Sequence, residues 1–212
     1  MENKYFSLLK NILDKGDSQK NKKGDIIYLV NQQLSLDNND LKLLFSQYKV
    51  PKRLLSDELT LYMSGETEVL KYEEKGIKWW NYCAPNMVNT YPTYFKKLPD
   101  LIKKINKEKR SSKNYVLFIG ETGVKTSQLP CLSLIQFQIV KDSLFITVYQ
   151  RSADSNLGLP CDIYHIKEIA EMIDIPLGNI TFFIGNAHIY KNNTKETYKM
   201  LDGLEYKYTL NT

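Results

Sequence analysis

A cysteine in an unusual position is the residue of this sequence that most directly suggests chemistry. Cys131 follows Pro130 at the head of the apolar run LSLIQFQIV, where a free cysteine is usually a small core hydrophobe. A second segment, QRSADSNLGLPCD (150–162), gathers an arginine, a serine and two acids around a Gly-Leu-Pro turn. In a third, His188 and Tyr190 stand two residues apart and share one face of a strand. A thiolate can act as a nucleophile, and an arginine with a serine can bind a phosphate group.

The elements that position these residues follow from the spacing of apolar side chains. Runs of β-branched and aromatic residues predict strands over 24–36, 113–120, 132–140, 143–151 and 180–190. Helical spacing predicts helices over 2–14, from Ser56 as N-cap to Tyr62, after Thr67, over 98–110 and over 162–174, with a long loop over 84–99. The pattern is that of an α+β protein with a mostly β core and helices outside.

Length and composition set further bounds. The 212 residues, 42% of them hydrophobic, suit a single domain over 1–212. No apolar run is long enough to span a membrane and the N-terminus does not resemble a signal peptide, so we expect a cytoplasmic protein without a membrane partner. The three cysteines lack metal-ligand spacing, so no metal is expected. The net charge of +5 suits ligands that carry phosphate groups. Nucleic-acid binding is not expected to be the main role, because the sequence contains no recognised motif for it.

Several short motifs, in order and at compatible spacing, resemble the thymidylate synthase family. The most diagnostic is QRSADSNLGLPCD, and GNAHIYKN is the second; the others are ILDKGDSQKN, DELTLYMSGET, GIKWWNYCAP and TYPTYF. The resemblance runs almost from end to end. It implies an α+β layer fold with a large mixed sheet flanked by helices, in a homodimer formed through the sheet. It also implies transfer of a one-carbon unit from 5,10-methylenetetrahydrofolate to C5 of a pyrimidine nucleoside monophosphate.

The resemblance assigns the catalytic roles. Cys131 matches the nucleophile that adds to pyrimidine C6 and so makes C5 nucleophilic, and nearby Arg151 is expected to favour its thiolate. Glu58 matches the general acid/base, and Tyr94 matches the hydroxyl that assists loss of the C5 proton. Cys83, Cys161 and His165 match no family role and are expected to be structural residues.

Binding roles follow from the same comparison. Lys23, Arg151 and Ser152, with Lys113 from the partner subunit, are expected to bind the phosphate. His188 and Tyr190 are expected to bind the sugar, and Trp80 and Asp154 the folate. Where the family has two adjacent partner arginines, this chain has Lys113 and Asn114, which weakens the phosphate clamp. Some of these binding roles have a structural alternative. Lys23 could be an ordinary surface charge, Trp80 could serve packing alone, and His188 and Tyr190 could be ordinary strand residues.

The departure that bears on the substrate is Asp162. Methylating members of the family have Asn here, whose amide complements O4 and N3–H of uracil. An ionised carboxylate only accepts hydrogen bonds, so it complements the 4-amino group of cytosine and favours protonation at N3. The cytidylate hydroxymethylase branch resembles this sequence in having Asp. The alternative is that Asp162 only caps the following helix.

Two further departures favour the same interpretation. Leu132 stands where thymidylate synthases usually have His, and the chain ends at Asn211 and Thr212 without the usual C-terminal extension of the family. A less covered site would admit water, which gives a hydroxymethyl product in place of a methyl product. We therefore expect a cytidylate 5-hydroxymethylase acting on CMP or dCMP in nucleotide biosynthesis. The alternatives are a thymidylate synthase that methylates dUMP and a non-catalytic nucleotide- or RNA-binding homologue.

Overall fold

The computed structural model describes residues 3–21, 23–203 and 206–207, with side chains up to 203, so the chain end at Asn211 and Thr212 lies outside the described residues. The helices are α1 (Lys4–Lys15), α2 (Asn38–Gln47), α3 (Lys52–Ser64), α4 (Val69–Glu74), α5 (Tyr91–Phe95), α6 (Leu98–Glu108), α7 (Gly158–Glu171) and α8 (Thr194–Leu201), with 3₁₀ helices η1 (Asn81–Cys83) and η2 (Lys191–Asn193). The strands are β1 (Asp17–Gln19), β2 (Ile26–Leu36), β3 (Tyr48–Lys49), β4 (Val116–Phe118), β5 (Leu132–Val140), β6 (Ser143–Gln150), β7 (Ala153–Asp154), β8 (Leu177–Tyr190) and β9 (Tyr206–Lys207).

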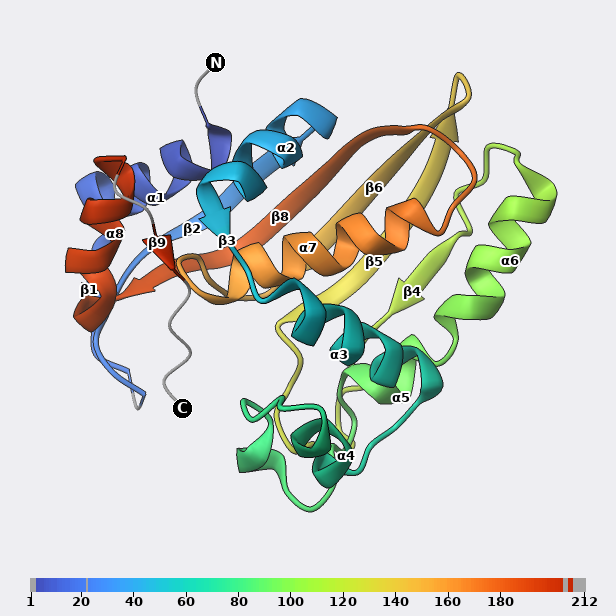
Figure 1. Cartoon of the computed structure of the whole chain (residues 1–212), viewed down its shortest axis with the longest axis horizontal. Coiled ribbons are helices and arrows are strands. Elements are labelled where there is room, and N and C mark those ends of the chain that lie inside the picture. The colour runs from blue at the N-terminus through green and yellow to red at the C-terminus, as the bar shows by residue number, and fades with distance from the viewer. Residues whose placement is uncertain (1–2, 22, 204–205, 208–212) are drawn as a thin grey trace.

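One large mixed sheet forms the centre of the molecule (Figure 1). Its strands run in the order β1-β2-β8-β6-β5-β4, and β7 pairs with the end of β8. Strands β6 and β8 are parallel, whereas β2 with β8 and β5 with β6 are antiparallel. The predicted α+β fold, with a large mixed sheet flanked by helices, is confirmed.

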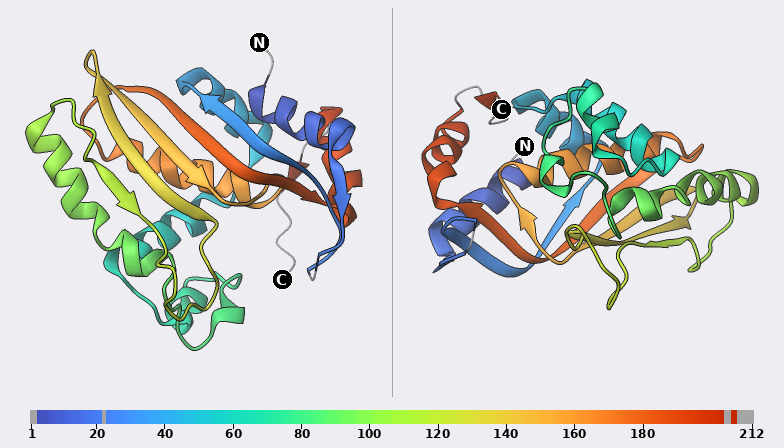
Figure 2. Two further views of the ribbon diagram at one scale, coloured as in Figure 1. Left: turned by 180° about the vertical axis from the view of Figure 1, so that it is seen from behind. Right: turned by 90° about the horizontal axis from the view of Figure 1, so that it is seen from below.

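The two faces of the sheet differ. Helices α2, α3 and α7 lie on one side, and Figure 2 shows the sheet in front of α7 when the molecule is turned around. On the helix-covered side the strands contribute buried residues such as Phe137, Val148 and Phe182. On the opposite face the register aligns Phe118, Leu134, Tyr149 and Phe183 across four strands. These strands therefore alternate between a buried face and a partly apolar exposed face.

Two buried tyrosines hold the turn that follows β7. The Tyr5 hydroxyl donates to the carbonyl of Ser155 at 2.8 Å, and the Tyr48 hydroxyl donates to the carbonyl of Asn156 at 2.6 Å. Both tyrosine side chains are fully buried. Buried hydroxyls with carbonyl partners fix backbone position, so α1 and β3 help to place the segment between β6 and α7.

The five predicted strands are present, although the one expected over 113–120 is only the three-residue β4, and several helix predictions need correction. Helix α3 begins at Lys52 after Pro51, so Ser56 is not its N-cap; the Ser56 hydroxyl bonds the Lys52 carbonyl instead. Helix α7 begins at Gly158, and the predicted loop over 84–99 contains α5. Helices α2 and α8 were not predicted. Within the described ranges, no helix has both the length and the apolar character needed to cross a membrane.

Candidate active site

A cavity of about 380 Å³ brings together six of the predicted site residues. Helices α3, α5 and α7 form its walls, with the segment before β5 and the turn after β6. The predicted residues in its lining are Glu58, Trp80, Cys131, Ser152, Asp154 and Asp162. A concave, largely apolar site with a few convergent polar groups is typical of small-molecule binding.

Cys131 precedes β5 and is fixed through its backbone. Its N–H donates to the Tyr91 hydroxyl at 3.2 Å, and its carbonyl accepts from the Arg151 N–H at 2.8 Å. The Arg151 Nη2 lies 3.9 Å from the Cys131 Sγ, while the same guanidinium donates to the carbonyls of Leu129 and Pro130. Burial raises the pKa of the Cys131 thiol, and the charge of Arg151 opposes this without overcoming it. Arg151 therefore lowers the thiol pKa as expected, but the thiol still stays protonated more readily than usual.

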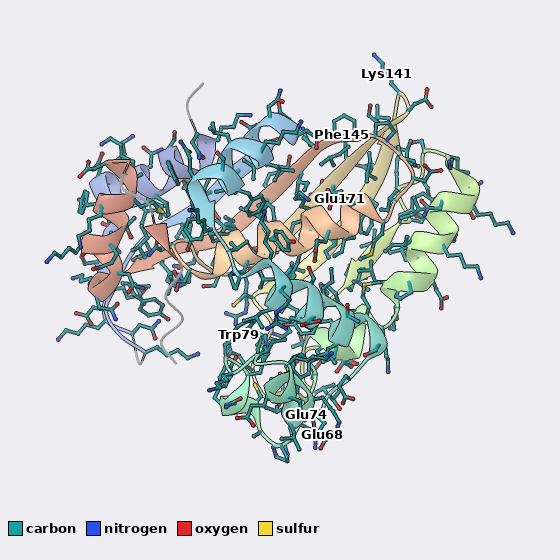
Figure 3. The ribbon with its side chains drawn as sticks, viewed as in Figure 1. Glu68, Glu74, Trp79, Lys141, Phe145 and Glu171 are labelled. Atoms are coloured by element: carbon teal, nitrogen blue, oxygen red, sulfur yellow. The ribbon has the colours of Figure 1, made fainter. Side chains whose placement is uncertain are left out.

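Glu58, on α3, has a donor on each carboxylate oxygen. Its Oε1 accepts from the Tyr62 hydroxyl at 2.7 Å and from the indole Nε1 of Trp79 at 2.6 Å and of Trp80 at 2.5 Å. Trp79 is labelled in Figure 3. The Oε2 lies 3.3 Å from His165 Nε2. Glu58 is buried, and these donors stabilise its ionised form.

Asp162 lies inside α7, four residues after the helix begins at Gly158. It is therefore not the N-cap of this helix, which removes the capping alternative. Its Oδ2 accepts a hydrogen bond of 2.6 Å from the amide Nε2 of Gln150, which is fully buried. Desolvation raises the pKa of Asp162 to about 6, against the charge of His165 and the Gln150 hydrogen bond. At neutral pH the carboxylate is mostly ionised.

Asp154 lies at the end of β7 and lines the same cavity. Its Oδ1 accepts from the backbone N–H groups of Asn156 and Leu157, both at 3.2 Å. Burial raises the pKa of Asp154 to about 6. Trp79 and Trp80 give the cavity aromatic surface, and the Asp154 carboxylate gives it a hydrogen-bond acceptor. Together they fit a flat ring with N–H donors, such as a pterin.

The structure does not bring Tyr94 into the cavity; Tyr91, three residues earlier, lies there. Tyr91 and Phe95 are one helical turn apart on α5, and both rings pack against Tyr62. Tyr94 lies on a different face, where its hydroxyl donates to Asn89 Oδ1. Burial raises the pKa of Tyr91 well above its ordinary value, so its hydroxyl stays protonated at neutral pH.

Five predicted binding residues lie outside the lining of the cavity: Arg151, described above, and Lys23, Lys113, His188 and Tyr190. The Lys23 ammonium lies 5.2 Å from the ring centre of Tyr82, which belongs to the lining. His188 Nδ1 lies 3.5 Å from the Ser152 hydroxyl, and the His188 ring meets that of Tyr190 edge to face. Lys113 is exposed and does not line the cavity of its own chain.

Sequence reasoning does not assign several lining residues to the site, among them Trp79, Tyr91 and His165. His165 follows Asp162 by three positions, so both share one face of α7. That spacing was a usable signal that His165 faces the same space as Asp162. Nothing in the sequence marked its partner, because Glu58 is more than 100 positions away on α3.

Comparison with known proteins agrees with this fold. The thymidylate synthase family model matches residues 3–209. The thymidylate synthase of Buchnera aphidicola subsp. Schizaphis graminum (strain Sg) is 27% identical over 218 residues, which cover 93% of this chain and 82% of that protein. The class is thus that of the folate-dependent one-carbon transferases. The chain belongs to the thymidylate synthase family.

Proposed function

We propose that this member of the family is a cytidylate 5-hydroxymethylase, which adds a one-carbon unit and water to C5 of CMP or dCMP. The observation that carries the proposal is the Asp162 carboxylate in the cavity wall. Gln150 occupies its Oδ2, while no described group donates to Oδ1. An acceptor without a donor suits the 4-amino group of cytosine and leaves uracil O4 facing another set of lone pairs.

We assign the other residues the roles that the family resemblance implies. Cys131 adds to C6 of the base after losing its thiol proton, and the Arg151 guanidinium beside it stabilises the thiolate. Arg151 and Ser152, with Lys23 and the partner's Lys113, bind the phosphate, and His188 and Tyr190 bind the sugar. Glu58 accepts and returns protons, and Tyr91 takes the role expected of Tyr94. Asp154 and Trp80 hold 5,10-methylenetetrahydrofolate, which supplies the one-carbon unit.

A second candidate function is methylation of dUMP, and one observation favours it. The pKa of Asp162 lies at about 6, so its protonated form is accessible at mildly acidic pH. A protonated carboxyl has one donor and one acceptor, as an amide does, and so could pair with uracil. The similarity to a thymidylate synthase is equally compatible with this activity.

A substrate panel separates the two candidates. The protein is incubated with methylenetetrahydrofolate and each of CMP, dCMP, UMP and dUMP, and the nucleotides are analysed by mass spectrometry. Gain of CH2O on a cytidylate supports the proposal and identifies the sugar. Gain of CH2 on dUMP supports methylation and overturns the cytidylate assignment.

We also propose that the protein is a homodimer through the open face of the sheet. Phe118, Tyr149 and Phe183 are 67%, 45% and 42% exposed, and their side chains form one row with Leu134. An exposed apolar row of this kind is typical of a contact surface. The partner that fits is a second copy of this chain, as in the family.

Phe183→Lys is expected to weaken the dimer at least about 100-fold, because the change buries a charge at the centre of the contact. Analytical ultracentrifugation over a concentration series measures this. Activity should fall in parallel, since the partner's Lys113 is removed from the site. Met172→Lys, at a residue of similar exposure on the helix side, is the matched control and should remain dimeric. A monomeric wild type would contradict the proposal.

A further inference from the structure

His165 occupies a position between two elements of the active site. It lies on α7, is buried, and faces α3, where its Nε2 is 3.3 Å from Glu58 Oε2 and 3.1 Å from the Leu55 carbonyl oxygen. Both neighbours are acceptors, so Nε2 carries a hydrogen and donates to them. The ring of Tyr62 packs edge to face against the imidazole. The histidine is thus held in one orientation toward Glu58.

The charges around the cavity are unbalanced without this histidine. The lining contains three carboxylates, Glu58, Asp154 and Asp162. Among the described residues that line the cavity, His165 is the only basic side chain. Several ionised carboxylates in a partly desolvated space are costly unless a cation accompanies them. Because Asp162 and His165 are three residues apart on one helix, the imidazole is placed to act on both Asp162 and Glu58.

We propose that His165 is a positioning residue whose imidazolium fixes the Glu58 carboxylate in its ionised form and balances the charge of Asp162. This inference deepens the proposed function and relies on it for the roles of the two carboxylates. Asp162 adds a negative charge that an asparagine would not bring, and His165 supplies the compensating positive charge. Glu58 is then available to accept a proton during the reaction.

The directions of the pKa shifts agree with the geometry. Burial would lower the pKa of His165, but the hydrogen bond and charge of Glu58, with the charge of Asp162, raise it above its ordinary value. Burial would raise the pKa of Glu58, but His165 and the two indole N–H groups hold it below its ordinary value. Each group therefore stabilises the charged form of the other.

Other titratable groups face this pair without competing with it. Tyr62 on α3 faces both members, and the charge of Glu58 also acts on Tyr72 and Tyr82. The pKa of each of these three tyrosines is raised by burial, so all stay neutral between pH 5 and 9. Between pH 5 and 9, the titratable neighbours of Glu58 that change their charge are therefore His165 and Asp162.

The test uses the fact that the chain has two histidines, His165 and His188. In protein labelled with ¹³C-histidine, NMR follows both imidazoles through a pH titration, and His188→Asn assigns the signals. We expect His165 to titrate above its ordinary 6.5, with its pKa falling by at least about one unit in Glu58→Gln. His188, whose pKa is lowered by burial, should not respond. A His165 that titrates below 6.5, or ignores Glu58→Gln, would overturn the proposal.

The pH dependence of kcat provides a second test. A purely structural role of His165 would not shift this pH dependence. His165→Gln can retain an N–H donor but loses the positive charge, so the pKa of Glu58 rises. The acidic limb of the kcat profile should therefore move up by about one pH unit, with activity partly regained at higher pH. Equal loss at every pH would contradict a positioning role. The NMR result does not depend on which nucleotide reacts, so its failure is distinguishable from failure of the proposed function.

Discussion

Asp162→Asn is expected to lose at least about 100-fold in kcat/KM toward cytidylate and to gain activity toward uridylate. The amide that replaces the carboxylate has a donor as well as an acceptor, so it pairs with uracil O4 and N3–H. With cytosine, the same amide lacks the favourable negative charge in either orientation. In one of the two orientations it also turns its N–H donor toward the 4-amino group, which is itself a donor. Steady-state kinetics with CMP, dCMP, UMP and dUMP measure the exchange of preference.

The matched control for this variant is Asp174→Asn, an exposed carboxylate just beyond α7. It removes the same charge from the surface and should leave both substrate preferences unchanged. If Asp162→Asn keeps full activity toward cytidylate, the carboxylate does not recognise the base. If it loses activity toward every nucleotide while remaining folded, Asp162 serves the reaction in another way.

Loss of activity in Asp162→Asn should not come from loss of stability. The folded-state pKa of Asp162, about 6, lies above the ordinary 3.8, so the folded chain holds this proton more tightly than the unfolded chain. The associated stability is complete below pH 3.8 and is lost as the pH rises to 6. At pH 7 the variant should be more stable by about 1–2 kcal/mol, with solvent in the cavity reducing the effect. Denaturant unfolding at pH 4 and 7 measures this difference.

Cys131→Ser is expected to lower kcat by at least about 10⁴-fold while nucleotide affinity changes less than about threefold. A serine hydroxyl has a similar size but is not deprotonated at neutral pH, so addition to C6 fails. Kinetics give the first quantity and calorimetric titration with nucleotide gives the second. Mass spectrometry of the quenched wild-type reaction should show a protein–nucleotide adduct that the variant lacks.

Cys83→Ser provides the comparison for the nucleophile. Cys83 is buried but does not line the main cavity, so this variant should keep its adduct and its turnover. A Cys131→Ser variant with wild-type turnover would exclude covalent catalysis by this thiol. A wild type without turnover on any pyrimidine nucleotide would favour a protein that binds nucleotides or RNA without reacting.

The long strands were predictable because each alternates or concentrates β-branched and aromatic residues between turns. Helix α2 was missed although Asp37 and Asp40 form a capping box, a signal that the sequence did contain. Helix α7 begins earlier than predicted because Gly158 and Pro160 are compatible with a first turn. The boundary matters here, since it places Asp162 within the helix and toward the cavity.

The site was predictable where a motif names a residue and unpredictable where a contact joins distant elements. Glu58 and Asp154 lie in such motifs, and the structure brings them to one cavity. The family motif points to Tyr94, but a stretch of five residues does not reveal which of two tyrosines a short helix turns inward. The pairing of His165 with Glu58 depends on how α3 packs against α7, which no local pattern contains.

The origin of the added oxygen distinguishes hydroxymethylation from methylation. The wild type is incubated with methylenetetrahydrofolate and the cytidylate in ¹⁸O-labelled water, and the nucleotide product is analysed by mass spectrometry. We expect a gain of one CH2O unit that carries the heavy oxygen, with tetrahydrofolate as the other product. A product that gains CH2 without oxygen, accompanied by dihydrofolate, would contradict hydroxymethylation.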